Sequence, residues 1–342
     1  MTDEKKKTII FRVDAGEVIG MGHFVRCYAL AKHLSVREGA RIVFAMKDGD
    51  QFAPIVENSG FEIFAFDESD PTAVLSQYPS DCAVVDIPSE AEGFVAAARD
   101  AEMKTVVIDD LGGKSFGSDF LVNGTVVDAF RDYPEDAAKK MLLGPKHMII
   151  REEFAAVASG ARWITKEVGS VFVSLGGEDP HGVINAIVTA LEKIRFGGKV
   201  IIALGASFPD PDGFIKMTEG LTCRYEVLHN LPSIAPVMRA ADIAVVNAGM
   251  TLYELACVGT PGLVVAMNEQ QWSEAREFSR LGAVLNLGMW DVVDEQWLAD
   301  DLQRLIDSRD LRVMMSEAGP GIIDGMGIYR IGRELLAEIS NR

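Results

Sequence analysis

The chain has 342 residues, of which 48% are hydrophobic and 25% charged, a composition typical of a globular protein with room for two cores. The net charge of −18 argues against nonspecific nucleic-acid binding, because the phosphate backbone would be repelled. Its four cysteines are scattered without metal-ligand spacing, and the sequence contains no apolar run of membrane-spanning length. We therefore expect a cytoplasmic protein without signal peptide, integral membrane segment or bound metal.

The first half alternates short apolar runs with segments of helical length. The runs are continuous and rich in β-branched residues, which indicates parallel strands that are covered on both faces. We predict strands at 9–13, 42–45, 61–64, 83–85, 106–108 and 120–122, and helices that include 22–37 and 90–101.

The second half repeats this alternation. Strands are predicted at 171–175, 200–204, 225–228, 243–246, 262–266 and 283–287, and helices include 181–194 and 252–258. We expect an α/β fold of two doubly wound, Rossmann-like domains facing a cleft, with ligands at the carboxyl ends of the strands. The predicted domains are 1–155 and 165–322, followed by a closing helix within 323–342 that packs back on the first domain.

The most informative motif lies where the first strand meets the first helix. Two glycines, Gly20 and Gly22, form the turn, and His23 stands at the start of the helix. Backbone amides and the positive end of a helix favour an anion there. They also favour neutral imidazole, which is the form that acts as a general base.

The second predicted domain opens with Gly176 and Gly177 directly after a strand. Glycine permits backbone conformations that other residues resist, so this loop could face a phosphate. It could equally be a tight turn in which Asp179 caps the next helix, with Pro180 at its first position. The residues alone leave the two interpretations even.

A further turn ends at Gly249, and Thr251 lies where a helix begins. Thr251 could cap that helix or donate its hydroxyl to a phosphate. Glu254, one turn later, could complete a capping box or accept hydrogen bonds from ribose hydroxyls; taken alone, the spacing favours capping. After the next strand, Asn268 and Gln270 bring polar amides to the same edge of the sheet.

Asp109 and Asp110 follow a predicted strand and could be interpreted as metal ligands. Adjacent side chains of a strand point to opposite sides, so they suit a shared ion poorly. We expect a loop or capping role for both residues, and no metal site.

Together these segments resemble a family of spore coat polysaccharide biosynthesis glycosyltransferase-like proteins and UDP-sugar hydrolases of pseudaminic acid synthesis. The second half also looks like the nucleotide-sugar half of GT-B glycosyltransferases, which include the peptidoglycan N-acetylglucosaminyl transferase. Hydrolases often carry Val-Asp-His-Tyr where this chain has Val85-Asp86-Ile87-Pro88. The matching segments are 12–16, 20–27, 107–111, 143–145, 151–154, 173–180, 247–270 and 324–330.

The resemblance implies a GT-B fold and a role for each matching residue. His23 corresponds to the catalytic histidine of the hydrolases, and Glu254 to the carboxylate that binds ribose. The turn at Gly249, Met250 and Thr251 matches the one that holds the diphosphate. The other candidate substrate-binding residues are Gly20, Gly22, Arg26, Gly176, Gly177, Asn268 and Gln270.

The leading prediction is a hydrolase that cleaves a UDP-linked amino or deoxy sugar at the anomeric carbon, in surface polysaccharide or pseudaminic-type acid synthesis. Water would attack, His23 would take its proton, and UDP would leave without any cofactor. The alternatives are an inverting UDP-sugar glycosyltransferase, a UDP-sugar 2-epimerase, which has weaker support, and a noncatalytic nucleotide-sugar binding protein.

Overall fold

The computed structural model describes residues 6–16, 20–47, 49–87, 91–160, 162–177 and 179–340. Pro88 and Glu178, which belong to two of the motifs above, lie outside these ranges. The chain divides into two compact units. Unit 1 comprises Met1–Glu152 and Met326–Arg342, and unit 2 comprises Glu153–Gly325.

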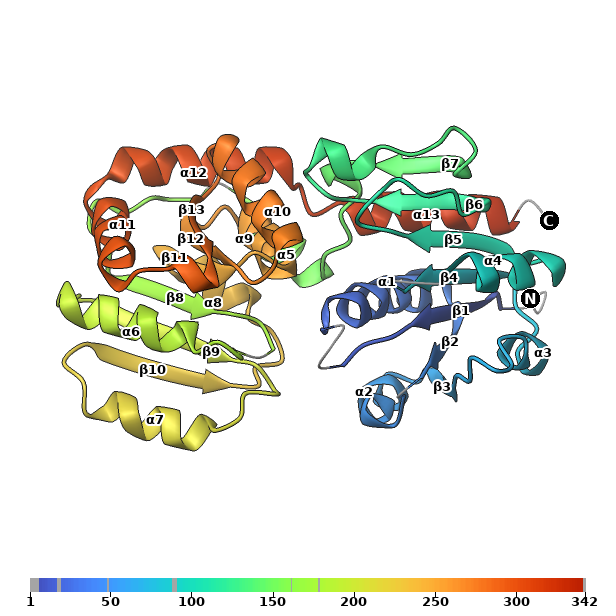
Figure 1. Cartoon of the computed structure of the whole chain (residues 1–342), viewed down its shortest axis with the longest axis horizontal. Helices are drawn as coiled ribbons and strands as arrows, with labels where there is room; N and C mark the ends of the chain where they lie inside the picture. Colours follow the sequence, from blue (N-terminus) through green and yellow to red (C-terminus); the bar gives the residue numbers. More distant parts are fainter. Residues whose placement is uncertain are drawn as a thin grey trace. The chain divides into compact units, whose positions relative to one another are not determined.

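Unit 1 is built on a parallel sheet in the order β3-β2-β1-β4-β5-β6-β7 (Figure 1). Strands β1, β4 and β6 are buried along their whole length, as expected for parallel strands covered on both faces. The strands are β1 (Thr8–Val13), β2 (Arg41–Met46), β3 (Glu62–Ala65), β4 (Cys82–Asp86), β5 (Lys104–Ile108), β6 (Ser118–Asn123) and β7 (Ala138–Leu143).

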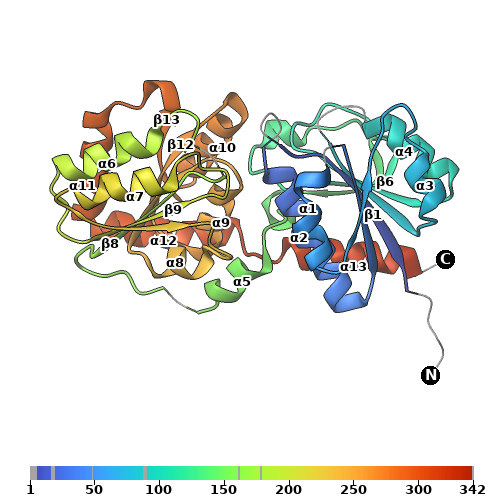
Figure 2. The ribbon, with the colours of Figure 1, turned by 90° about the horizontal axis from the view of Figure 1, so that it is seen from below.

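Helices cover both faces of this sheet (Figure 2). One apolar cluster joins a face of the sheet to α1 (Gly22–Glu38), α2 (Ala53–Asn58) and α13 (Gly327–Ser340). The other joins the opposite face to α3 (Ala73–Gln77) and α4 (Ala91–Asp100). Thus the last helix of the chain completes the core of the first unit.

A buried histidine secures α13 against α1. The His33 ring packs edge-on against Tyr329, with 4.8 Å between ring centroids, and its Nδ1 contacts Glu152. A Cβ atom at Gly332 would lie 2.9 Å from Nε2 of His33, so glycine is needed for this close approach.

Unit 2 has a parallel sheet in the order β10-β9-β8-β11-β12-β13. Helices α6, α7 and α11 share an apolar cluster with the sheet, while α9 and α10 pack against β11, β12 and β13. The strands are β8 (Ser170–Ser174), β9 (Lys199–Leu204), β10 (Arg224–His229), β11 (Ile243–Asn247), β12 (Gly262–Ala266) and β13 (Leu285–Met289). The helices are α5 (Glu152–Ala158), α6 (Val183–Lys193), α7 (Pro211–Glu219), α8 (Ala235–Ala240), α9 (Met250–Val258), α10 (Glu269–Arg280), α11 (Glu295–Asp307) and α12 (Arg309–Ile322).

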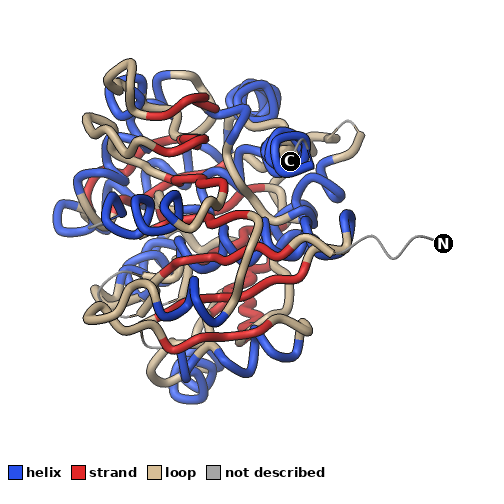
Figure 3. The backbone as a smooth tube through the Cα atoms, turned by 90° about the vertical axis from the view of Figure 1, so that its right-hand side faces the viewer, coloured by secondary structure: helices blue, strands red, loops and turns tan. Residues whose placement is uncertain are grey.

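Figure 3 marks the helices and strands by colour. Strands and helices alternate as predicted over most of the described chain, but in it β5, β6 and β7 have no α-helix between them, and α11, α12 and α13 have no strand between them. The sequence prediction missed β7, which lies at the sheet edge and carries the exposed residues Lys139 and Lys140, so it lacks a continuous apolar run. It also placed the last strand at 283–287, whereas β13 spans Leu285–Met289. Ala283 and Val284, directly before Leu285, are buried but lie outside the strand, and their hydrophobicity misled the prediction.

Candidate functional site

Each sheet has one point where the direction of its strand order reverses. In unit 1 it lies between β1 and β4, and in unit 2 between β8 and β11. The loops that leave the carboxyl ends of these strand pairs diverge to opposite faces, which opens the place where doubly wound sheets bind ligands. The predicted residues His23, Gly176 and Gly249 all follow strands of these two pairs.

His23 occupies the second position of α1, after Gly22. The N-cap residue is Met21, which makes no side-chain capping hydrogen bond. Before it, Gly20 donates a 2.7 Å backbone hydrogen bond to Gly16, and its φ of +79° is a conformation that favours glycine. The glycine turn therefore places the His23 imidazole at the start of α1, where the backbone amides have no side-chain cap and the helix dipole is positive.

Asp86 ends β4 and meets this histidine. Nδ1 of His23 lies 2.7 Å from Oδ1 of Asp86. Because an ionised carboxylate can only accept, the contact assigns the ring proton to Nδ1. Nε2 of the neutral ring then carries the lone pair, and 24% of the side-chain surface of His23 remains exposed. The ring is thus arranged to take a proton from an approaching group.

Arg26 holds Asp86 in place from one turn further along α1. Its Nε donates to Oδ2 of Asp86 at 2.6 Å and its Nη2 to Oδ1 at 2.7 Å, while its Nη1 donates to Asp110 at 2.7 Å. Burial acts to raise the pKa of Asp86, but the charge of Arg26, with a smaller effect of His23, holds it well below its ordinary value. Burial likewise acts to lower the pKa of Arg26, whereas Asp110 and Asp86 raise it.

These bonds change the interpretation of Arg26, which we predicted to bind substrate. Its guanidinium is buried and is committed to two carboxylates, so it is not available to a phosphate in this structure. Cys27 adds a further donor, since its Sγ lies 3.3 Å from Oδ2 of Asp86. Burial, reinforced by the charge of Asp86, raises the pKa of this thiol, which therefore stays protonated.

Asp109 and Asp110 have different hydrogen-bond partners, because adjacent side chains point in different directions. Oδ2 of Asp109 accepts hydrogen bonds from the amides of Leu111 and Gly112 and from the hydroxyl of Tyr133, the last at 2.5 Å. The predicted loop role of Asp109 is therefore confirmed. Asp110, by contrast, pairs with Arg26 and belongs to the candidate site, a role that the sequence prediction missed.

In unit 2 the corresponding point is built from glycines and a carboxamide. Gly176 has a φ of +91°, and a Cβ there would lie 3.3 Å from Nδ2 of Asn247, the last residue of β11. A Cβ at Gly205 would lie 2.5 Å from the carbonyl oxygen of Gly176 and closer still to that of Gly177. Among the described residues, buried Oδ1 of Asn247 has no hydrogen-bond partner. The carboxamide oxygen of Asn247 is thus a hydrogen-bond acceptor at this turn without a partner among the described residues.

The loop after β8 also caps the next helix. Both carboxylate oxygens of Asp179 accept hydrogen bonds, from the amides of Val183 and Ile184, which confirms its predicted capping role. Pro180 does not occupy the first helical position as predicted, because Gly182 is the N-cap residue and α6 begins at Val183.

The structure excludes the capping-box interpretation of Thr251 and Glu254. The N-cap residue of α9 is Gly249, without a side-chain capping bond, and Thr251 is the second residue of the helix. Glu254 is 2% exposed and lies near Cys257, whose pKa is raised to about 12 by burial and then by the charges of Asp324 and Glu254. The start of α9 therefore has no side-chain cap, which is the kind of helix end that can bind an anion.

Asn268 and Gln270 have different environments. Asn268 is the N-cap residue of α10, and its Oδ1 accepts a hydrogen bond from the amide of Gln271 at 2.9 Å. Gln271 reaches the Gly249 turn, since its Nε2 lies 3.6 Å from the position of a Cβ on Gly249; the role of Gln270 stays a prediction. Oε1 of Gln271 accepts from the amide of Met267, which fixes the side chain.

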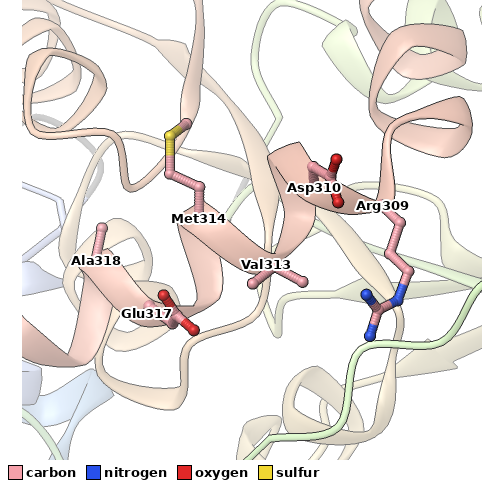
Figure 4. Close-up of a pocket in the computed structure, with 6 residues that line it drawn as sticks. All are labelled: Arg309, Asp310, Val313, Met314, Glu317 and Ala318. Atoms are coloured by element: carbon pink, nitrogen blue, oxygen red, sulfur yellow. The ribbon is translucent and has the colours of Figure 1, made fainter.

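A hollow of about 550 Å³ lies elsewhere, along α12 (Figure 4). It is lined by residues of this helix alone, namely Arg309, Asp310, Val313, Met314, Glu317 and Ala318. It contains none of the predicted site residues, so it is separate from the candidate site.

The chain is similar to a glycosyltransferase domain and to a polysaccharide biosynthesis protein. Residues 171–323, most of unit 2, match the family described as Glycosyltransferase family 28 C-terminal domain. The chain is also 27% identical over 325 residues to the spore coat polysaccharide biosynthesis protein SpsG of Bacillus subtilis (strain 168), with 93% of this chain and 94% of that protein covered. The resemblance predicted from the sequence motifs is thereby confirmed.

Solved structures show the same fold at low sequence identity. The structure is similar to MurG of Acinetobacter baumannii, with a TM-score of 0.73 and 13% identity over 97% of this chain and 99% of that chain. It is also similar to UGT71G1 of Medicago truncatula, determined with UDP-glucose, with a TM-score of 0.63 and 14% identity over 99% and 100% of the two chains. The chain therefore has the predicted GT-B fold, with two Rossmann-like domains. Within the described residues, no helix is both long and apolar enough to cross a membrane.

Proposed function

We propose that this protein is an inverting glycosyltransferase of polysaccharide biosynthesis, which transfers a sugar from a UDP-sugar to a hydroxyl of an acceptor. The observation that carries the proposal is the 2.7 Å contact between Nδ1 of His23 and Asp86, which leaves Nε2 as the proton acceptor. A base arranged in this way suits the deprotonation of a hydroxyl group.

The comparisons favour transfer over the hydrolysis that we predicted first. They link the chain to a glycosyltransferase domain and to a polysaccharide biosynthesis protein, and give no support to a hydrolase. A transferase and a hydrolase need the same base, and differ in whether a sugar hydroxyl or water attacks. The role in pseudaminic-type acid synthesis stays a prediction.

The proposed reaction moves one proton and exchanges one bond. The acceptor hydroxyl gives its proton to Nε2 of His23, and its oxygen attacks the anomeric carbon of the donor sugar. The bond from that carbon to the diphosphate oxygen breaks, UDP leaves with the electron pair, and the configuration at the anomeric carbon inverts. Asp86 stabilises the imidazolium that forms, as a carboxylate partner does in catalytic triads.

Unit 2 supplies the proposed donor site. The uncapped start of α9 at Gly249, Met250 and Thr251 suits the diphosphate, because free amides and the helix dipole stabilise an anion. The proposed contact of Glu254 with ribose hydroxyls needs some opening around its buried carboxylate. UDP-glucose in the similar structure of UGT71G1 supports a UDP-sugar as the ligand.

The test is to incubate the purified protein with a panel of UDP-sugars, with and without hydroxyl acceptors, and to measure UDP and sugar products. UDP release that needs an acceptor, with an inverted glycoside as product, supports the proposal. Free sugar and UDP without acceptor would establish hydrolysis instead, a new UDP-sugar epimer would establish epimerisation, and binding without turnover would leave a noncatalytic role. His23→Asn should keep UDP affinity and lose roughly 100-fold or more in turnover.

A further inference from the structure

The cluster around His23 contains more charge than a histidine–carboxylate pair requires. Arg26 is bonded to two carboxylates, Asp86 and Asp110, from the ends of two adjacent strands. Two negative charges therefore share one positive charge, and the cluster has one surplus negative charge while His23 is neutral. Protonation of His23 would bring the cluster to neutrality.

Arg26 also limits how the ring can be protonated. Its Nη2 lies 3.1 Å from Nδ1 of His23, and both atoms are donors, so this approach is not a hydrogen bond. Asp86 therefore accepts from both groups through Oδ1 and from Nε of Arg26 through Oδ2, and it can hold all three bonds only while it is ionised and in its present rotamer. The Asp86 side chain is buried, so its charge depends on these protein donors.

Asp110 is itself fixed by its surroundings. The preceding residue, Asp109, is tied to Tyr133, and Nδ2 of Asn123 donates to the same tyrosine hydroxyl at 2.8 Å. At Gly112 a Cβ would lie 2.9 Å from the carbonyl oxygen of Phe130, so the loop is closely packed. The backbone on both sides of Asp110 is therefore held in place, and its carboxylate bonds to Nη1 of Arg26 at 2.7 Å.

We infer that Arg26 and Asp110 are positioning residues for the proposed base. Together they hold the Asp86 carboxylate against Nδ1 of His23, and Asp110 supplies the charge that balances the imidazolium formed during the reaction. The inference rests on the proposed function in so far as His23 acts as the base. The ionisable groups facing Asp86 are His23, Arg26 and Cys27 on α1, and Asp110 acts on it through Arg26.

The experiment compares Asp110→Asn, Arg26→Lys and Arg26→Met with Glu62→Gln. Glu62→Gln is the control because Glu62 also accepts two hydrogen bonds from an arginine of unit 1. That arginine is Arg41, and the pair is exposed. We expect Asp110→Asn to lower kcat about tenfold with an unchanged donor KM, since the lost charge acts only when His23 is protonated. Arg26→Met should move the acid limb of the kcat profile to higher pH, because buried Asp86 then takes up a proton. Arg26→Lys should restore part of the rate.

A second readout does not depend on turnover. Nitrogen NMR of the imidazole rings, with His23→Asn used to assign the His23 signals, reports which ring nitrogen carries the proton in the free protein. We expect the Nδ1–H form in the wild type and in Glu62→Gln, and a loss of that preference in Arg26→Met. Variants whose kcat, pH profile and ring tautomer match the control would overturn the inference, even if His23→Asn is inactive. An active His23→Asn would instead refute the base, while the ring spectra would still decide whether Arg26 and Asp110 position it.

Discussion

Asp86→Asn gives a sharp test of the histidine site, because the substitution keeps the size of the side chain and removes only its charge and one acceptor. In the protein Asp86 accepts three strong hydrogen bonds, two from Arg26 and one from Nδ1 of His23. An asparagine has one oxygen and one NH₂ group for these three donors. At least one donor must then face another donor.

The two orientations of the new amide have different consequences. If its oxygen faces Nε of Arg26, its NH₂ group faces His23, and Nδ1 must become an acceptor. The ring proton then moves to Nε2, where it blocks the proposed base. If the amide turns the other way, its NH₂ group opposes Nε of Arg26 inside the protein, which leaves an unpaired buried donor.

Both orientations also remove the carboxylate charge that would stabilise the imidazolium, so we expect a folded protein with lower stability and little turnover. We expect kcat to fall by roughly 10³-fold, within the range found for general base catalysis, and the free energy of unfolding to fall by about 3 kcal/mol, at the low end for a broken buried ion pair because the shape is kept. Denaturant unfolding and UDP-sugar turnover on the same sample measure the two effects.

The matched control is Asp119→Asn, a buried carboxylate of the same sheet that accepts from Thr105 and Lys139 near the amino ends of the strands. It should lower stability and leave turnover per folded molecule unchanged. If Asp86→Asn behaves like this control, with near-normal turnover, the proposed role of the histidine site is wrong.

The pH dependence of stability provides a further check on Asp86. Its pKa in the folded protein is depressed, so its contribution to stability is fully present above the unfolded pKa of about 3.9 and is lost as the pH falls toward the folded value. The difference in unfolding free energy between wild type and Asp86→Asn should therefore shrink as the pH falls below about 4. A constant difference down to pH 3 would contradict this assignment.

Three further predictions concern unit 2 and the acidic residues. Glu254→Ala should weaken UDP binding in calorimetry while the fold survives, and unchanged affinity in a folded variant would refute its assignment to ribose. Gly205→Ala places a Cβ 2.5 Å from the carbonyl oxygen of Gly176; it should cost about 1–3 kcal/mol of stability and weaken UDP binding, whereas a neutral effect on both would show that the loop yields freely. Turnover should persist after treatment with a chelator, because Asp109 and Asp110 are engaged with Tyr133 and Arg26; activity that vanishes and returns with magnesium or manganese would disprove this.

Much of the fold follows from the order of apolar runs along the chain. Strands buried on both faces, such as β1 and β12, are continuous and apolar, so their positions can be predicted within one or two residues. The edge strand β7 carries exposed lysines and gives no such signal. The exact helix starts could not be predicted either. A side chain can cap a helix only from the N-cap position, and α9 already begins at Met250, so Thr251 lies inside the helix.

The candidate site was predictable only in part, for a geometric reason. A motif such as the glycine turn before His23 is local, and sequence spacing reveals it. Asp86 and Asp110 lie 60 and 84 positions from Arg26, and only the pairing of β1 with β4 and of β4 with β5 brings them to it. The available signal was a charged residue at the end of a buried strand, as Asp86 is after four hydrophobic residues.

The same position in the two sheets carries different chemistry, and the difference fits the proposed roles. Asp86 and Asn247 each end the strand that follows the reversal of strand order, yet one is a carboxylate and the other a carboxamide. A carboxylate suits a histidine that becomes positive, whereas at position 247 it would repel a diphosphate bound at the start of α9. Asn247→Asp should therefore weaken UDP binding by on the order of 100-fold, as for two like charges near 6 Å at an effective dielectric constant of about 20. Uridine, which lacks the diphosphate, should lose far less affinity. Equal losses for UDP and uridine would show that the substitution distorts the glycine turns, and unchanged UDP affinity would place the diphosphate elsewhere.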